Sequence, residues 1–178
     1  IAHSFLLTGS RGIGKTSTAR IIAKGLNCLA SSANNLPTVD PCGECESCIS
    51  ITQSRHIDVI EMDAASRTGV SDVREIIDNI DYKTVYARYK VYIIDEVHML
   101  SNSAFNALLK TLEEPPAHVK FIFATTEILK IPTTIISRCQ RFDLERIDNN
   151  LINNHLSDVC NKEKIIFSEG ALKMISNV

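Results

Sequence analysis

The feature that most constrains this chain is a glycine-rich segment near its start. Residues 9–16 form the sequence Gly-Ser-Arg-Gly-Ile-Gly-Lys-Thr and match the pattern G-x-x-x-x-G-K-[ST] at every fixed position. Glycines in such a loop let successive backbone N–H groups point inward at phosphate oxygens, and the N-terminus of a following helix adds positive partial charge. The alternative is a glycine-rich turn whose lysine has no function, and such a turn requires neither a strand before it nor a helix after it. Here an apolar run at 4–8 precedes the loop and a helical pattern at 14–27 follows it, which favours a phosphate site.

Apolar runs and helical repeats alternate along the rest of the chain. Strands are predicted at 58–62, 91–94, 119–125 and 140–144, helices at 73–80 and 105–112, and a short connection at 131–138. The continuous apolar run of the third strand is typical of a central parallel strand that is covered on both faces. The alternation predicts βαβ units, and therefore an α/β fold built on a parallel sheet.

The length of 178 residues predicts one domain, or one domain and part of a second. Residues 1–146 carry the strands, and a loop-rich insertion at 28–54 interrupts them with four of the six cysteines. From 147 to 178 two helices are predicted, and we interpret this end as the start of a helical second domain. The chain begins with a strand and lacks an initial methionine, so we interpret it as a piece of a longer protein.

Two acidic residues, Asp95 and Glu96, end the third predicted strand. The carboxyl edge of a parallel sheet is where such folds bind ligands, so we expect both acids beside the glycine loop. Asp95, with the hydroxyl of Thr16, is suited to hold Mg²⁺, and Glu96 is suited to polarise an attacking water. Solvated acids at a strand end would be favoured if this motif stood alone. Thr125 and Thr126 end the next strand at the same edge, where a hydroxyl can bond a phosphate or the water.

The insertion offers four thiols in a spacing that suits a metal. Cys42, Cys45 and Cys48 form C-x₂-C-x₂-C, and Cys28 lies upstream. Four thiolates at about 2.3 Å make a closed tetrahedral Zn²⁺ site, which is structural because no position remains for water. Disulfides are one rival interpretation, and an iron–sulfur cluster is a second, because iron also takes four cysteines. We expect zinc.

The overall charge limits how the chain can contact nucleic acid. With 19 basic and 21 acidic residues the net charge is −2, so any such contact must come from a local patch. Arg67 and Arg74 flank the start of the helix at 73–80 and are candidates for contacts with the DNA backbone. The alternative for Arg74 is an ion pair with Asp78 at i, i+4. No apolar run approaches the roughly 18 residues of a membrane span, and we expect no membrane partner.

Together these motifs resemble a known family. The glycine loop, the Asp-Glu pair, the Ala-Thr-Thr strand end at 124–126 and the Ser-Arg-Cys triplet at 137–139 come in the order found in AAA+ ATPases of the clamp-loader type. The stretches at 63–67, 95–101 and 106–115, and the four-cysteine insertion, closely resemble the gamma/tau subunits of bacterial DNA polymerase III. The resemblance runs from residue 1 to about 145.

This resemblance implies a five-stranded parallel sheet followed by a helical lid. It implies a cytoplasmic ATP hydrolase that uses ATP, Mg²⁺ and Zn²⁺ to load a sliding clamp onto primed-template DNA during replication. It also implies the other loader subunits, the polymerase core and the replicative helicase as partners. As part of the polymerase III holoenzyme, such a subunit would also be grouped with DNA-directed DNA polymerases, which are nucleotidyltransferases.

The resemblance also implies roles for particular residues. Thr126 matches the first sensor, and Arg138 matches an arginine finger that acts on ATP bound to the adjacent subunit. From the residues alone, a surface arginine paired with a local acid would be favoured for Arg138, and the resemblance reverses that preference. The expected nucleotide-binding residues are Gly9, Ser10, Arg11, Gly12, Ile13, Gly14, Lys15, Thr16, Ser17 and Asp95.

Two other functions stay open. One is a zinc-bearing scaffold with a decayed nucleotide site, although such a site would be expected to lose Lys15 or one of the acids. The other is a different AAA+ machine, such as a branch-migration motor, which the Ser-Arg-Cys triplet and the cysteine insertion disfavour.

Overall fold

A computed structural model of the protein describes residues 2–30, 36–66 and 70–176. The chain divides into two compact units, Ile1–Leu144 and Glu145–Val178. No helix in the described part of the chain is long and apolar enough to cross a membrane.

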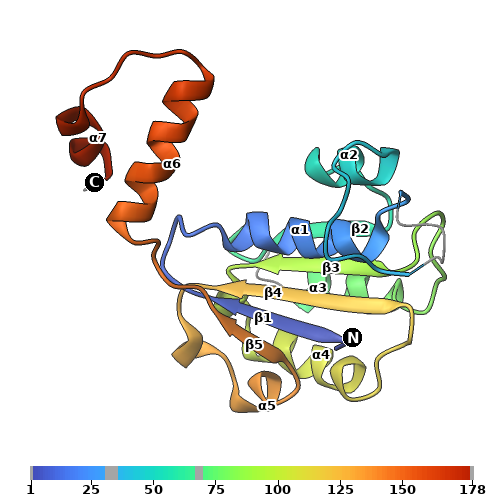
Figure 1. The fold of residues 1–178 in the computed structure, drawn as a ribbon. Coiled ribbons are helices and arrows are strands. Elements are labelled where there is room, and N and C mark those ends of the chain that lie inside the picture. The colour runs from blue at the N-terminus through green and yellow to red at the C-terminus, as the bar shows by residue number, and fades with distance from the viewer. Residues whose placement is uncertain (1, 31–35, 67–69, 177–178) are drawn as a thin grey trace. The chain divides into compact units, whose positions relative to one another are not determined.

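The first unit is built on a parallel sheet of five strands (Figure 1). The strands are β1 (Ser4–Thr8), β2 (Val59–Asp63), β3 (Lys90–Asp95), β4 (Val119–Thr125) and β5 (Gln140–Asp143). They lie in the order β2-β3-β4-β1-β5, and every neighbouring pair is parallel. The predicted α/β fold with a five-stranded parallel sheet is therefore confirmed.

Helices cover both faces of this sheet (Figure 1). On one side lie α1 (Lys15–Asn27) and α2 (Glu46–Thr52). On the other side lie α3 (Val70–Asp78), α4 (Asn102–Glu113) and the short α5 (Thr133–Ile136). Two 3₁₀ turns, η1 (Val97–Met99) and η2 (Ile128–Lys130), follow β3 and β4.

Apolar side chains form one core on each side of the sheet. The apolar face of α1 buries Ala19, Ala23 and Leu26 in one core, and α3 and α4 bury Val73, Ile76, Phe105 and Leu108 in the other. The strands β3 and β4 lie between these cores, which explains their almost continuous burial. Because burial of each large aliphatic side chain is worth about 1.5–3 kcal/mol, the two cores fix the strand ends in place.

Two helices lie where the sequence predicts no helix. α2 lies inside the insertion at 28–54, and α5 lies inside the connection at 131–138. The side chain of Cys45 caps α2 by accepting a hydrogen bond from the Cys48 N–H, and cysteine is not among the usual N-cap residues. With seven and four residues, the two helices are also too short to show a helical repeat.

The insertion is tied closely to α1. A Cβ atom added at Gly25 would lie 2.6 Å from the carbonyl oxygen of Thr38, so only glycine permits this approach. The Thr38 N–H donates to the Gly25 carbonyl at 2.8 Å. At the end of α1, the Arg88 guanidinium donates to the carbonyls of Leu26 and Cys28 at 3.0 and 2.6 Å. These contacts fix the segment at Cys28, the first cysteine of the cluster, and the segment at Thr38, which precedes the other three.

The second unit contains α6 (Asn149–Lys162) and α7 (Glu169–Ser176). Asp148 caps α6, since its side chain accepts a hydrogen bond from the Asn150 N–H at 2.6 Å. Leu172 of α7 is buried, but no residue of α6 is. The helical pair expected from 147 onward is present, and much of the apolar face of α6 stays accessible.

Candidate functional site

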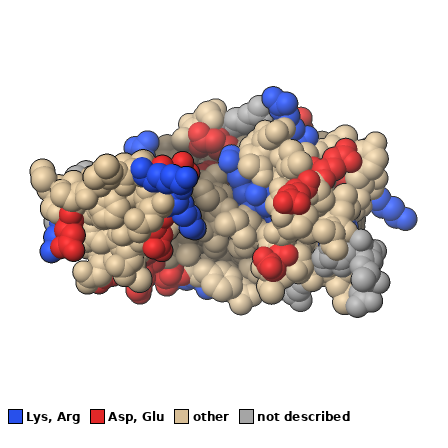
Figure 2. All heavy atoms as spheres, turned by 45° about the horizontal axis from the view of Figure 1, so that its top comes forward, with Lys and Arg blue, Asp and Glu red and all other residues tan. Residues whose placement is uncertain are grey.

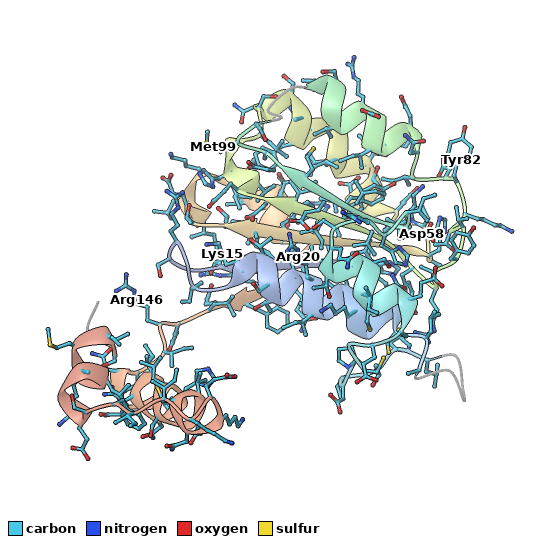
Figure 3. The ribbon with its side chains drawn as sticks, turned by 90° about the horizontal axis from the view of Figure 1, so that it is seen from above. Lys15, Arg20, Asp58, Tyr82, Met99 and Arg146 are labelled. Carbon is cyan, nitrogen blue, oxygen red and sulfur yellow. The ribbon has the colours of Figure 1, made fainter. Side chains whose placement is uncertain are left out.

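The carboxyl ends of β2, β3 and β4 and the start of α1 border a cleft of about 800 Å³. In Figure 3, Lys15 and Met99 lie at this end of the sheet, and Asp58 and Tyr82 lie at the opposite end. The residues that line the cleft are Arg11, Gly12, Gly14, Lys15, Thr16, Ser17, Asp63, Ala65, Asp95, Glu96, His98, Met99 and Thr126. Most of the predicted nucleotide-binding residues thus share one cavity with both predicted acids, while Gly9, Ser10 and Ile13 belong to the same loop without lining it.

The loop before α1 has a conformation that suits its glycines. Gly12 and Gly14 have φ angles of 81° and 94°, in the left-handed region that glycine enters without strain. α1 begins directly afterwards, and its first residue, Lys15, is only 6% exposed. The Lys15 Nζ donates to the carbonyl oxygens of Gly9 and Ser10 at 3.1 and 3.0 Å. The amine is therefore held across the loop, beside the cleft.

The loop meets the end of β3 directly. The Thr16 hydroxyl donates a short hydrogen bond to Asp95 Oδ2, although the two residues are 79 positions apart in the sequence. The other carboxylate oxygen of Asp95 accepts from the Glu96 N–H at 2.9 Å. Hydroxyl and carboxylate oxygens are the ligands that Mg²⁺ prefers, so the donor set fits this ion.

Glu96 and Thr126 lie together in the cleft. The Glu96 Oε2 atom accepts from the Thr126 N–H at 3.2 Å and from the Thr126 hydroxyl at 3.0 Å. Glu96 has φ 46° and ψ 44°, a left-handed conformation that costs a residue with a side chain of order 1–3 kcal/mol. Such conformations persist where surrounding contacts determine them, and they cluster at functional sites.

Two ionisable side chains that line the cleft, those of His98 and Asp63, were given no role from the sequence. His98 is buried beside Glu96, and Asp63 ends β2 directly opposite Asp95 in the β2–β3 register. A signal for Asp63 is present in the sequence, because it follows a predicted strand as Asp95 does. None exists for His98, whose placement depends on the 3₁₀ turn after β3.

An ion pair on the cleft's flank fixes α1 to the sheet. Arg20, labelled in Figure 3, lies one turn after Thr16 and donates to both carboxylate oxygens of Glu61 on β2, at 2.9 and 2.7 Å. These hydrogen bonds raise the pKa of Arg20 above its usual value, against the lowering effect of burial. The planar guanidinium and carboxylate thereby set the distance between α1 and β2.

Arg138 lies outside the cleft. Its guanidinium forms a short ion pair with Glu113 at the end of α4 and donates to the Thr134 carbonyl at 2.7 Å. Within this one chain, Arg138 is therefore a surface arginine paired with a local acid. An action on a neighbouring subunit's nucleotide involves a second chain and stays a prediction.

The four predicted metal ligands converge in the insertion. The Sγ atoms of Cys28, Cys42, Cys45 and Cys48 all lie within 4.8 Å of one another, and Cys28 and Cys42 are 3.6 Å apart. Four bonds of about 2.3 Å in a tetrahedron require sulfurs about 3.8 Å apart, so the cluster fits zinc. Burial raises the pKa of Cys48 to about 12, whereas N–H and S–H donors outweigh burial at Cys45 and lower its pKa to about 6. All six cysteines lie within the described ranges, and no disulfide joins any two of them.

Of the two arginines predicted to contact DNA, the structure describes Arg74. Arg67 lies outside the described residues. Arg74 is exposed on α3 and forms no ion pair with Asp78, although the structure describes both residues. Figure 2 shows basic and acidic side chains interspersed on the face in view, in keeping with the near-neutral charge of the chain.

Known structures share this fold. A DNA polymerase III gamma subunit-related protein from Thermotoga maritima matches with a TM-score of 0.59 at 19% identity, covering 98% of this chain and 53% of that one. The RuvB Holliday junction branch migration motor of the same organism matches with a TM-score of 0.62 at 17% identity, covering 99% of this chain and 48% of that one. At such low identity the likeness shows the fold alone, which is the fold that the resemblance implies.

Sequence relatives are much more similar. The DNA polymerase III subunit tau/gamma of Haemophilus influenzae is 55% identical over 170 residues, covering 96% of this chain and 24% of that protein. The subunit tau of Escherichia coli and that of Bacillus subtilis are each 51% identical over 176 residues, covering 99% of this chain and 27% and 30% of those proteins. This chain thus spans about a quarter of the length of these curated relatives, and the predicted resemblance to gamma/tau subunits is confirmed. A family model described as DNA polymerase III, delta subunit, matches residues 1–148, and the chain belongs to that family.

Proposed function

We propose that this chain is the ATP-hydrolysing part of a clamp-loader subunit. The observation that carries the proposal is the shared cleft, in which Lys15 and Thr16 of the glycine loop meet Asp95 and Glu96. Relatives named as tau and gamma subunits of DNA polymerase III support the replication context.

The glycine loop and α1 bind the triphosphate of ATP in this proposal. Backbone N–H groups of the loop and the N-terminus of α1 contact the phosphates. Lys15 exchanges its bonds to the Gly9 and Ser10 carbonyls for bonds to β- and γ-phosphate oxygens. Thr16 and Asp95 would hold Mg²⁺, which would neutralise charge on the phosphate oxygens.

Glu96 activates the water that attacks the γ-phosphate. The water oxygen forms a bond to the γ-phosphorus as the bond to the bridging oxygen of ADP breaks. The water proton passes to Glu96 and then to the phosphate product or to solvent. Thr126 holds Glu96 through its backbone N–H and its hydroxyl, which supports a sensor role at the γ-phosphate.

Arg138 acts in trans as an arginine finger. Its partner Glu113 is half exposed, so an incoming anionic phosphate of a neighbouring subunit competes for the guanidinium at modest cost. A positively charged group supplied across a subunit boundary makes turnover depend on assembly.

The rest of the proposed activity belongs to a longer protein and its partners. The unit that begins at Glu145 is proposed as the start of a helical lid. Loading of a sliding clamp onto primed-template DNA involves the other loader subunits, the clamp, the polymerase core and the replicative helicase. The cleft contains the parts of an ATP site, so the activity proposed for this chain is ATP hydrolysis. A grouping of the subunit with DNA-directed DNA polymerases would follow only from its membership of the holoenzyme.

The cysteine cluster is proposed to bind one structural Zn²⁺. Four sulfurs leave no open position for water, which excludes a catalytic role for that ion. Arg74, exposed on α3, is proposed together with Arg67 to contact the phosphate backbone of DNA without reading bases.

The test is ATP turnover by the full-length protein assembled with its loader partners, with and without primed DNA and clamp. We expect turnover that both additions stimulate, and loss of ATP binding in Lys15→Ala. Turnover that ignores both additions would favour another motor of this fold. A wild-type protein that binds no nucleotide would favour a zinc-bearing scaffold.

A further inference from the structure

A histidine with no part in the steps above is buried in the cleft. His98 belongs to η1, and its side chain is only 5% exposed. Figure 3 shows the next residue, Met99, at the same end of the sheet as Lys15. A polar ring buried here requires partners, because an unpaired buried donor costs about 1–3 kcal/mol.

Each ring nitrogen of His98 faces a polar group. Nδ1 lies 3.0 Å from the Thr125 Oγ1 and 3.4 Å from the Glu96 Oε2. Nε2 lies 3.4 Å from a carboxylate oxygen of Glu127. Thr125 is fully buried, and its oxygen also accepts the Glu127 N–H at 3.0 Å, so the hydroxyl has its remaining contact with His98.

These contacts make the two carboxylate oxygens of Glu96 unequal. Oε2 accepts two hydrogen bonds from Thr126 and faces the His98 ring. The described residues place no hydrogen bond on Oε1. Oε2 is thus the oxygen that anchors the side chain, and Oε1 is the oxygen left to meet a water.

We propose that His98 is a positioning residue for ATP hydrolysis. Its Nδ1 side braces the buried Thr125 hydroxyl and the anchored oxygen of Glu96, which keeps Oε1 directed at the attacking water. This inference rests on the proposed ATPase function. In this inference the Nδ1 side of the ring positions Glu96, whereas the Nε2 side only faces the half-exposed Glu127.

The experiment measures ATP binding and steady-state turnover in the assembled full-length protein. In His98→Ala we expect kcat to fall about tenfold or more, since loss of its hydrogen bond leaves the buried Thr125 hydroxyl beside Glu96 without that partner, with ATP affinity within about twofold. His98→Asn places an amide near the Nδ1 position and should recover most of the turnover. His98→Gln places its amide nearer the Nε2 position and should not.

The controls separate this inference from the proposed function. His155→Ala, at an exposed position of α6, should leave both quantities unchanged. If the wild-type protein has no Lys15-dependent turnover, the proposed function fails and the inference fails with it. If that turnover is present and His98→Ala keeps its kcat, or loses ATP affinity as strongly as turnover, only the inference is overturned. Should the alanine variant not fold, equal turnover in the asparagine and glutamine variants would overturn the inference.

Discussion

At the end of the sheet opposite the cleft, the buried carboxylate of Asp58 binds the backbone of the loop that precedes β3. Asp58 is 2% exposed and accepts hydrogen bonds from the backbone N–H groups of Val85, Tyr86 and Ala87 at 2.9 to 3.1 Å. Burial by itself would raise the pKa of Asp58, but these donors outweigh burial and lower it below the ordinary value of 3.8. The ionised form therefore stabilises the folded loop before β3.

This arrangement predicts an acid-sensitive contribution to stability. A carboxyl whose pKa is lowered by folding stabilises the protein above its unfolded pKa, and the contribution is lost as pH falls through the folded value. We expect Asp58→Asn to lower the free energy of unfolding by about 1–3 kcal/mol at pH 7. The deficit should be smaller at about pH 3, because this pH lies below the ordinary value of 3.8 and the contribution of the lowered pKa is already being lost there.

Urea unfolding at the two pH values measures this difference. Asp40→Asn is a matched control, because Asp40 is exposed and its side chain accepts none of the hydrogen bonds found for Asp58. A deficit for Asp58→Asn that is the same at both pH values would contradict the assignment.

The local chemistry of the cleft was partly predictable from sequence. The spacing of the glycine loop identifies Lys15 and Thr16, and the carboxyl-edge rule places Asp95 and Glu96 near them. His98 could not be predicted, because its position depends on a turn of three residues that folds it back against β4. The spacing of residues in the sequence also does not predict whether Arg138 pairs with an acid of its own chain or contacts the nucleotide of an adjacent subunit.

Among the secondary-structure elements, the fully buried strands β1 and β4 were predicted best. The bounds of β1 and β4 match their apolar runs, because strands buried on both faces tolerate few polar residues. The insertion was predicted as a loop because α2 depends on a cysteine cap and on its contacts with α1 rather than on an apolar repeat. The four cysteines of the cluster all lie in this insertion.

The cluster predicts that metal content and stability of the insertion vary together. We expect one zinc per chain by elemental analysis, and metal binding that contributes on the order of 10 kcal/mol to ordering the module. Removal by a chelator should lower the melting temperature and make the thiols of Cys28 and Cys48 reactive, since both are buried in the folded module.

A matched pair of variants checks the assignment. Cys45→Ser should lose zinc, whereas Cys160→Ser should keep it, because Cys160 lies in the second unit and is not part of the cluster. Visible absorbance of iron, or two disulfides in protein purified under reducing conditions, would contradict the zinc site.

The proposed effect of Arg138 belongs to the scale of the proposed loader assembly. In this chain the guanidinium is occupied by Glu113, and the cleft contains Lys15 and Arg11 but not Arg138. An active site that takes one cation from its neighbour links hydrolysis to the geometry of the subunit boundary.

Arg138→Ala should therefore keep ATP binding and lose turnover in the assembly by roughly 10³-fold or more. Arg141→Ala is the control, because Arg141 is also an exposed arginine in an ion pair, with Asp143. Nucleotide binding and steady-state turnover of the assembled protein measure the effect. Retained turnover in Arg138→Ala would rule out the finger.

Helix α1 connects two chemistries that look independent along the sequence. It begins at the glycine loop and ends against Cys28, and its 13 residues span about 20 Å. In the proposal, the metal-bound cysteines hold one end of this helix and the phosphates hold the other, so unwinding at the cysteine end would extend toward the nucleotide. Removal of the proposed zinc should therefore weaken nucleotide affinity about 20 Å away, so nucleotide affinities of this protein should be compared at equal zinc content.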